Sequence, residues 1–321
     1  MATTITGFPG ITASYGNPNP AGIAGGLESY WGGGDVLFVG NRSGLPARDG
    51  SSPASPMSSL VGTGGALAKL NATTNRGHVI FVLPGSAYSV DAADWASATG
   101  AADSFAIVGL GSGTSRPTFT WTTATSSWLF DTANFKIDNC RLFLAGAHAA
   151  GAALTVAAPI TVSAAGCGIL NCDIWWGFDA DQIVAIGITL GTAADHFKFN
   201  KNRCYAETAA VPTTTFLRLT GADQLEIIGT HIVGPGSTTA IGPVQQLTTA
   251  CLKSTIVESI FQNTLAASTI AFTAIAGCTG IVDKCSFGVL AAGNGLTTGS
   301  GYQVTNSKTA NAAAAGADTT G

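Results

Sequence analysis

Apolar and polar positions alternate along most of this chain, and one short phrase of the alternation recurs. The phrase is an apolar residue, two variable residues, a small Cys, Asn, Thr or Ser, one variable residue, and usually a second apolar residue. Successive phrases lie 32, 30, 28, 29, 26 and 22 residues apart, a spacing typical of stacked structural units. They start at Ile137, Ile169, Phe199, Ile227, Ile256, Val282 and, more weakly, Val304.

A second strand-like piece and a short link precede most phrases. Residues 186–190 come before the phrase at Phe199, and residues 216–219 come before the phrase at Ile227. Within these pieces the apolar residues recur with period two, which is the spacing of strands. The links are rich in Gly, Ala, Ser, Thr, Asn and Asp, most of which favour turns. The pattern therefore predicts an all-β solenoid, in which each coil buries its inward side chains against its neighbours.

The small residue in the fourth slot of each phrase is expected to point into a corner of the coil. If coils stack at strand spacing, these side chains form an internal ladder with about 4.8 Å between neighbours. A small side chain with some hydrogen-bonding capacity suits such a corner, whereas an unpartnered charge would be costly to bury. The predicted ladder is Cys140, Cys172, Asn202, Thr230, Ser259, Cys285 and Ser307.

The entry to the coils adds a second cue. Residues 48–60 are rich in Ser and Pro, residues 66–70 fit a short amphipathic helix, and residues 77–88 fit a strand that ends at Pro84-Gly85 before Tyr88. With the stacked small slot, this segment resembles the right-handed parallel β-helix of the pectin-lyase-like kind, found in many bacteriophage virion proteins. The resemblance covers about residues 36–307 and implies a helix that caps the open end of the coil. It says little about function, since this fold hosts lyases, hydrolases, adhesins and inert virion parts.

Three regions are expected along the chain: an extended N-terminal arm at 1–34, the β-helix with its entry strand and cap helix at 35–309, and an Ala/Gly-rich tail at 310–321. Pro and Gly interrupt regular structure in the arm. The arm nevertheless carries more apolar and aromatic residues than a flexible linker needs, and we expect it to lie on a partner or a neighbouring copy. The alternative is that it folds back on its own solenoid. These arm residues are Ile5, Phe8, Ile11, Tyr15, Ile23, Leu27, Tyr30 and Trp31.

Composition narrows the class of protein. Charged residues make up 10% of the chain, hydrophobic residues 46%, and the net charge is −4. This balance argues against a disordered chain or a basic nucleic-acid surface, and it favours an outer surface covered by neighbours. Residues 149–172 carry no charge, but they contain Pro159 and alternate, so we interpret them as two coil strands and not a membrane span. The N-terminus shows no secretory signal pattern. Seven cysteines, an odd number, favour buried free thiols over a disulfide framework.

Candidate chemistry is sparse. Glycan hydrolysis needs two carboxyl groups about 5 to 10 Å apart, and four acids on consecutive coils are candidates for such a pair. They are Asp179, Asp181, Asp195 and Glu207, with Trp175 and Trp176 nearby as possible platforms for a sugar ring. The simpler alternative is that the acids are solvated loop residues and the tryptophans pack against a subunit. The four histidines have no metal-ligand spacing, so neither a metal nor a cofactor is predicted.

We expect a non-enzymatic structural protein of a tailed-phage virion. The favoured role is capsid decoration by a homotrimer that contacts the major capsid protein on the virion surface. We expect the protein to be made in the host cytoplasm and to have no nucleic-acid or membrane partner. The alternative is a tailspike or other receptor-binding protein that binds host surface glycan. Such a protein would also cleave the glycan if it is a depolymerase. A bacterial surface adhesin is a third alternative, disfavoured by the missing export signal.

Overall fold

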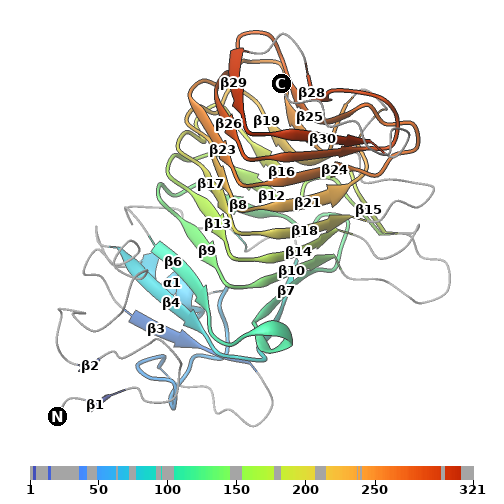
Figure 1. Ribbon diagram of the computed structural model, residues 1–321. Coiled ribbons are helices and arrows are strands. Elements are labelled where there is room, and N and C mark those ends of the chain that lie inside the picture. The colour runs from blue at the N-terminus through green and yellow to red at the C-terminus, as the bar shows by residue number, and fades with distance from the viewer. Residues whose placement is uncertain are drawn as a thin grey trace.

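The chain forms a parallel β-solenoid with almost no helix, as the repeated phrase predicts (Figure 1). The computed structural model describes residues 3–4, 14–15, 36–41, 49–62, 64–71, 77–91, 95, 105–144, 154–176, 182–206, 215–236, 238, 241–297 and 301–311. Nearly all of the expected arm, and residues 312–321 of the expected tail, lie outside these residues. Of the arm, only the backbone of a two-stranded antiparallel pair, β1 (Thr3–Thr4) and β2 (Ser14–Tyr15), is described.

Three parallel sheets make the sides of the solenoid. Sheet 1 holds β3 (Val36–Val39), β4 (His78–Val82), β6 (Phe105–Gly109), β9 (Lys136–Asp138), β13 (Gly168–Leu170), β17 (Lys198–Asn200), β20 (Glu226–Ile228), β23 (Ser254–Val257), β26 (Thr279–Asp283) and β29 (Gly301–Thr305). Sheet 2 holds β5 (Ala87–Val90), β7 (Thr118–Trp121), β10 (Arg141–Leu144), β14 (Asp173–Trp176), β18 (Arg203–Ala206), β21 (His231–Gly234), β24 (Ile260–Asn263), β27 (Ser286–Val289) and β30 (Lys308–Asn311). Sheet 3 holds β8 (Trp128–Phe130), β12 (Ile160–Val162), β16 (Ile186–Leu190), β19 (Thr215–Leu219), β22 (Val244–Gln246), β25 (Ile270–Ala274) and β28 (Gly295–Leu296). β11 (Leu154–Val156) pairs with β15 (Gln182–Val184) in a small separate sheet.

The recurring phrase spans the sharp corner between sheet 1 and sheet 2. Its first apolar residue faces inward from sheet 1, and its last faces inward from sheet 2. The strands of successive coils stack in register, so that Ile137 pairs with Ile169 and Ile169 with Phe199. This register places like positions of successive phrases one above another, which is why the apolar positions form a continuous core.

A residue in the left-handed backbone conformation makes each of these corners. The residue just before the ladder slot has a φ between 49° and 60° in all seven phrases. These residues are Asn139, Asn171, Lys201, Gly229, Glu258, Lys284 and Asn306. Left-handed residues other than Gly carry a steric cost, which is lower for Asn. The cost is offset because the backbone N–H here bonds to the next coil, as from Lys201 to the carbonyl of Ile228 at 2.8 Å.

All seven residues of the predicted ladder lie at these corners and are buried. In several coils the side chain accepts a hydrogen bond from the backbone N–H of the ladder residue in the preceding coil. Asn202 Oδ1 accepts from Cys172 N at 2.9 Å, and Thr230 Oγ1 accepts from Asn202 N at 3.3 Å. Ser259 and Ser307 do the same for the N–H groups of Thr230 and Cys285. These bonds satisfy backbone donors that the corner would otherwise bury without a partner.

Large aromatic side chains fill the core of the coils nearer the N-terminus. Trp128 is fully buried, and its ring lies 5.2 Å from that of Phe119 and 6.4 Å from that of Trp121. Trp121 in turn meets Trp176 edge to face at 5.2 Å. Buried aromatic side chains of this size contribute most of the apolar area that a core removes from water.

The N-terminal end of the solenoid is closed by the chain itself. The edge of β3 bonds to the segment after it, with Phe38 N donating to Gly50 O and Met57 N to Phe38 O, both at 2.8 Å. The single α-helix of the described residues, α1 (Ala66–Asn71), adds Leu67 and Leu70 to the buried core. The helix begins after Gly65, where an added Cβ would lie 2.4 Å from a backbone oxygen.

Asn202→Ala is predicted to destabilise the fold by about 1–3 kcal/mol, because it strips the buried N–H of Cys172 of its acceptor and the carbonyl of Ile169 of its donor. Urea unfolding followed by circular dichroism measures the change. Gln303→Ala, at an exposed position of β29, is the control and should change stability little. Equal stability of the two variants would contradict the role given to Asn202.

The seven cysteines are free and buried, and a thiol reagent should not reach them in the folded chain. Burial raises the pKa of Cys167 to about 12 and that of Cys285 to about 11, so these two groups carry little thiolate near pH 8. The hydrogen bond with Cys251 lowers the pKa of Cys278, and this thiol is shielded from a reagent by its burial. Ellman's reagent at that pH is expected to react slowly with native protein and rapidly with all seven thiols after unfolding in guanidinium. Rapid reaction of one thiol or more in the native state would contradict the described packing.

Candidate functional site

Three aromatic side chains form a stripe on the outer face of sheet 2. Phe143, Trp175 and Tyr205 occupy paired positions on β10, β14 and β18. Their ring centroids are 6.0 Å apart between Phe143 and Trp175 and 5.3 Å apart between Trp175 and Tyr205. They point outward because they alternate with inward residues such as Leu144 and Trp176. Trp175 is 36% exposed, and we call these three residues the aromatic stripe.

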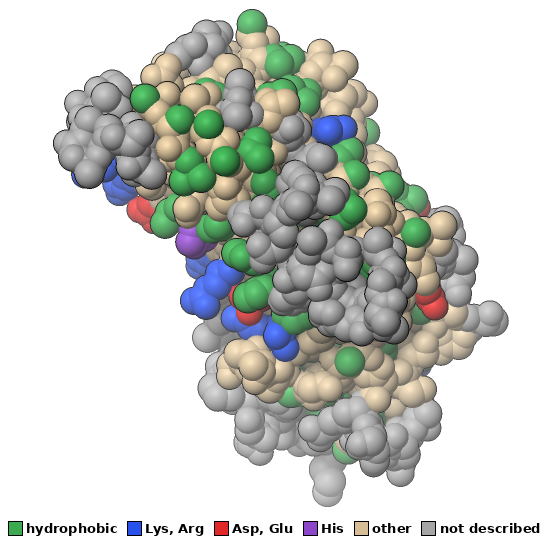
Figure 2. Space-filling view, turned by 90° about the vertical axis from the view of Figure 1, so that its right-hand side faces the viewer, with side chains coloured by type: hydrophobic (Ala, Val, Ile, Leu, Met, Phe, Trp, Pro, Cys, Tyr) green, Lys and Arg blue, Asp and Glu red, His purple; other side chains and the backbone are tan. Residues whose placement is uncertain are grey.

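A row of polar residues runs beside the aromatic stripe, two positions earlier on the same strands. Arg141, Asp173, Arg203 and His231 pair in register along β10, β14, β18 and β21, and we call them the polar row. The Arg141 guanidinium lies 4.3 Å from the centre of the Phe143 ring, a cation–π contact. In Figure 2, Lys and Arg side chains gather next to hydrophobic side chains along the left edge of the molecule.

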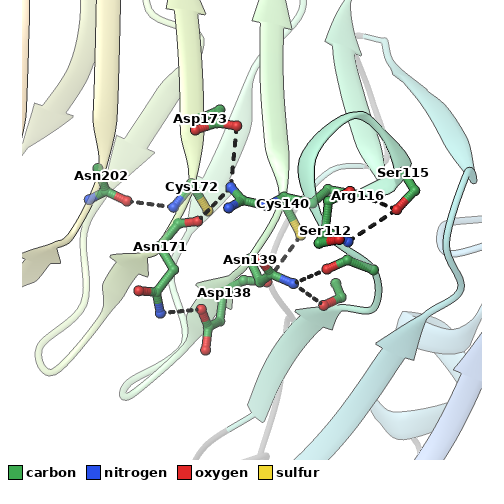
Figure 3. Close-up of polar contacts among 12 residues, drawn as sticks. Ser112, Ser115, Arg116, Asp138, Asn139, Cys140, Asn171, Cys172, Asp173 and Asn202 are labelled. Carbon is green, nitrogen blue, oxygen red and sulfur yellow. Dashed lines mark hydrogen bonds and ion pairs between the residues drawn. The ribbon is translucent and has the colours of Figure 1, made fainter. Parts of the chain in front are cut away.

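Arg116 holds the carboxylate of the polar row. Its Nη1 lies 3.3 Å from Asp173 Oδ2 and donates to the carbonyl of Asn171 at 3.1 Å, as Figure 3 shows. This ion pair neutralises the charge of Asp173. The charges of Arg141 and Arg203 therefore make the face positive. Burial and then the nearby Arg203 lower the pKa of His231, which keeps its imidazole neutral at neutral pH.

The face combines flat apolar rings with charged and neutral hydrogen-bonding groups at strand spacing. A ligand that fits it has an apolar ring face to lie on the aromatic stripe and polar groups at its edge for the polar row. A sugar ring with hydroxyl or carboxylate substituents has this chemistry. Aromatic residues and Arg are also enriched in protein interfaces, so the composition of this face suits a protein partner as well.

Asp195 lies away from this face, at the corner between sheet 3 and sheet 1. Its Oδ1 accepts the backbone N–H of Asp223 at 2.8 Å, and Asp223 Oδ1 accepts the N–H of Leu252 at 2.7 Å. The two carboxylates thus join successive coils. The other predicted acids, Asp179, Asp181 and Glu207, lie outside the described residues. Because Asp195 alone of the four lies in the described part of the chain, the predicted pair of acids stays a prediction.

Trp175 and Trp176 point to opposite sides of β14. Trp176 is fully buried and packs against Trp121 and Phe216, so only Trp175 faces outward. The sequence interpretation therefore missed the residues that accompany Trp175 on this face. Aligning the phrases and comparing the first and third residues after the ladder slot would have grouped the polar row and the aromatic stripe.

A second surface lies over the last coils. Six large hydrophobic side chains are exposed among the described residues, and all except Trp175 fall between residues 252 and 304. We call the other five the C-terminal apolar residues: Leu252, Ile260, Ile281, Leu290 and Val304. In the upper part of Figure 2, where these coils lie, hydrophobic side chains are scattered among few charged ones.

Neither surface is a metal centre by composition. Within the described ranges, no group of three or more His, Cys, Asp or Glu residues is arranged to hold an ion. The one α-helix described there has six residues, and no described helix reaches the length and apolarity of a membrane span.

Comparisons with known proteins add no relative. The chain matches no protein-family model, no curated protein and no solved structure.

Proposed function

We propose that this protein is a non-enzymatic structural component of a tailed-phage virion, a capsid decoration protein that binds the shell as a homotrimer. The observation that carries the proposal is the group of C-terminal apolar residues. Such side chains, exposed on several sides of the last coils in a chain of low charge, favour a protein that works among close neighbours. The closed and continuously hydrogen-bonded coils suit a load-bearing part, since each coil bonds to the next along all three sheets.

The expected contacts divide between the solenoid and the arm. The outer faces of the solenoids contact one another in the trimer, and the apolar residues of the arm contact the major capsid protein. Apolar burial contributes about 25 cal/mol per Å², before the cost of association is subtracted.

Deletion of residues 1–34 is predicted to release the protein from capsids and to leave the solenoid folded. Co-sedimentation with purified capsids measures binding, and circular dichroism measures the fold. A chain in which Ala replaces the aromatic arm residues Phe8, Tyr15, Tyr30 and Trp31 tests whether apolar contact, and not arm length, is responsible. Full binding by the truncated chain would contradict the proposed role of the arm.

A second candidate function is a receptor-binding protein that holds host surface glycan, and the aromatic stripe with its polar row favours it. On this view Trp175→Ala removes the exposed ring and weakens binding of host polysaccharide by about tenfold, since an aromatic contact contributes about 0.5–1.5 kcal/mol beyond its area. Isothermal titration calorimetry measures the change. Val233→Ala, in the same outward row on β21, is the control. Unchanged binding by Trp175→Ala would exclude the stripe as the glycan site.

Cleavage of glycan is tested separately. Alanine at Asp179, Asp181, Asp195 and Glu207 abolishes release of reducing ends from host polysaccharide if the protein is a depolymerase, whereas capsid binding stays unchanged if it is a decoration protein. Failure of the unmodified protein to bind capsids, together with release of reducing ends that the substitutions abolish, would contradict the decoration proposal.

A further inference from the structure

The two ends of the solenoid differ in whether other described segments of the chain cover their outermost strands. At the N-terminal end, the segment at residues 50–57 bonds to the edge of β3, and α1 packs beneath it. At the other end, β28, β29 and β30 are each the outermost strand of their sheet (Figure 1). Nothing in the described part of the chain covers these three edges. An uncovered edge offers unpaired N–H and C=O groups to another strand.

Among the described residues, nothing closes the core at this end either. Val304 is the inward residue of β29 and pairs with Val282, which in turn pairs with Ile256. Val282 and Ile256 are fully buried, whereas Val304 is 36% exposed. Val304 stands at the top of the inward apolar column of sheet 1, and no described residue forms a further coil over it.

The exposed apolar surface continues from the end onto the sides. Ile281 lies on the outer face of sheet 1 and is 48% exposed, and Ile260 lies on the outer face of sheet 2. Leu252 lies in the segment that leads from sheet 3 into β23, and Leu290 follows β27. A partner that buries these residues must therefore contact the C-terminal end of the solenoid and more than one of its sides.

Residues 312–321 do not suit this task. They read Ala-Ala-Ala-Ala-Gly-Ala-Asp-Thr-Thr-Gly and supply no large apolar side chain. A specific interface needs about 800 Å² from each partner, which a second folded chain supplies.

We propose that the C-terminal end of the solenoid is a self-association surface, at which a second copy of this chain adds β-structure to the open edges and buries the C-terminal apolar residues. This proposal rests on the structural role proposed above and names the partner of the same apolar surface. A second copy fits because it brings unpaired strand edges of the same kind and apolar residues that need the same cover. Charges do not oppose it. Between residues 241 and 311 the described charged residues are Lys253, Glu258, Asp283, Lys284 and Lys308, and Lys284 already pairs with Glu258 at 3.5 Å.

Sedimentation velocity of the full chain over a range of concentrations tests the proposal. Wild type should self-associate, and Val304→Lys should raise the dissociation constant by about tenfold or more, because a lysine would be buried without a partner. Ile281→Lys should act in the same direction from the outer face. Ile228→Lys is the matched control, since Ile228 lies on the same outer face of sheet 1 in an earlier coil, and it should leave the assembly unchanged.

Amide hydrogen exchange of β29 and β30 provides a second readout, and melting temperature establishes that each variant folds. Slow exchange in the wild-type assembly that becomes fast in Val304→Lys supports the proposal. A monomer at all concentrations with slowly exchanging β29 amides would overturn it, because the tail would then cover the end. An assembly that survives both Lys substitutions would also overturn it. Capsid co-sedimentation is measured on the same variants, so failure of self-association is distinguished from failure of the decoration role.

Discussion

The fold depends on hydrogen bonds that pass from each coil to the next at the corner between sheet 1 and sheet 2. The chain turns there within two residues, and a turn this tight buries backbone groups without a partner in their own coil. Two kinds of hydrogen bond to the next coil supply the missing partners. The left-handed residue donates its N–H to the next coil, and a small side chain of the next coil accepts the N–H of the ladder residue. Because both devices need exact stacking, they fix the register of the strands on either side of this corner, in sheets 1 and 2, and with it the position of their outward side chains.

That register explains why the inward half of the molecule was predictable from sequence. A residue that must fit a corner or face the core is restricted in size and polarity, and the restriction recurs with each coil. The phrase from Ile169 to Ile174 therefore shows both the strand spacing and the ladder slot. The left-handed position was not predicted, because Lys201, Glu258 and Lys284 occupy it beside Asn and Gly. Hydrogen bonds to the next coil hold these residues there against their local preference.

The outward half was less predictable, for the opposite reason. Outward positions face solvent or partners and carry no common restriction, so Asp173 and Tyr205 did not stand out in a single phrase. Adjacency in sequence was also misleading. Trp175 and Trp176 point to opposite sides of one strand, and Asp195 lies at a different corner, where its carboxylate joins two coils.

The central claim, that the coils stack in register at strand spacing, is tested most directly by distances between spin labels on the outer face of sheet 2. Thr120 and Val233 are separated by four coils in one outward row, and Thr120 and Gly288 by six. At strand spacing their backbones lie about 19 Å and about 29 Å apart. Paired labels measured by pulsed electron resonance should show distances that rise in this proportion. Equal distances for the two pairs, or a shorter one for the six-coil pair, would contradict the stacked solenoid.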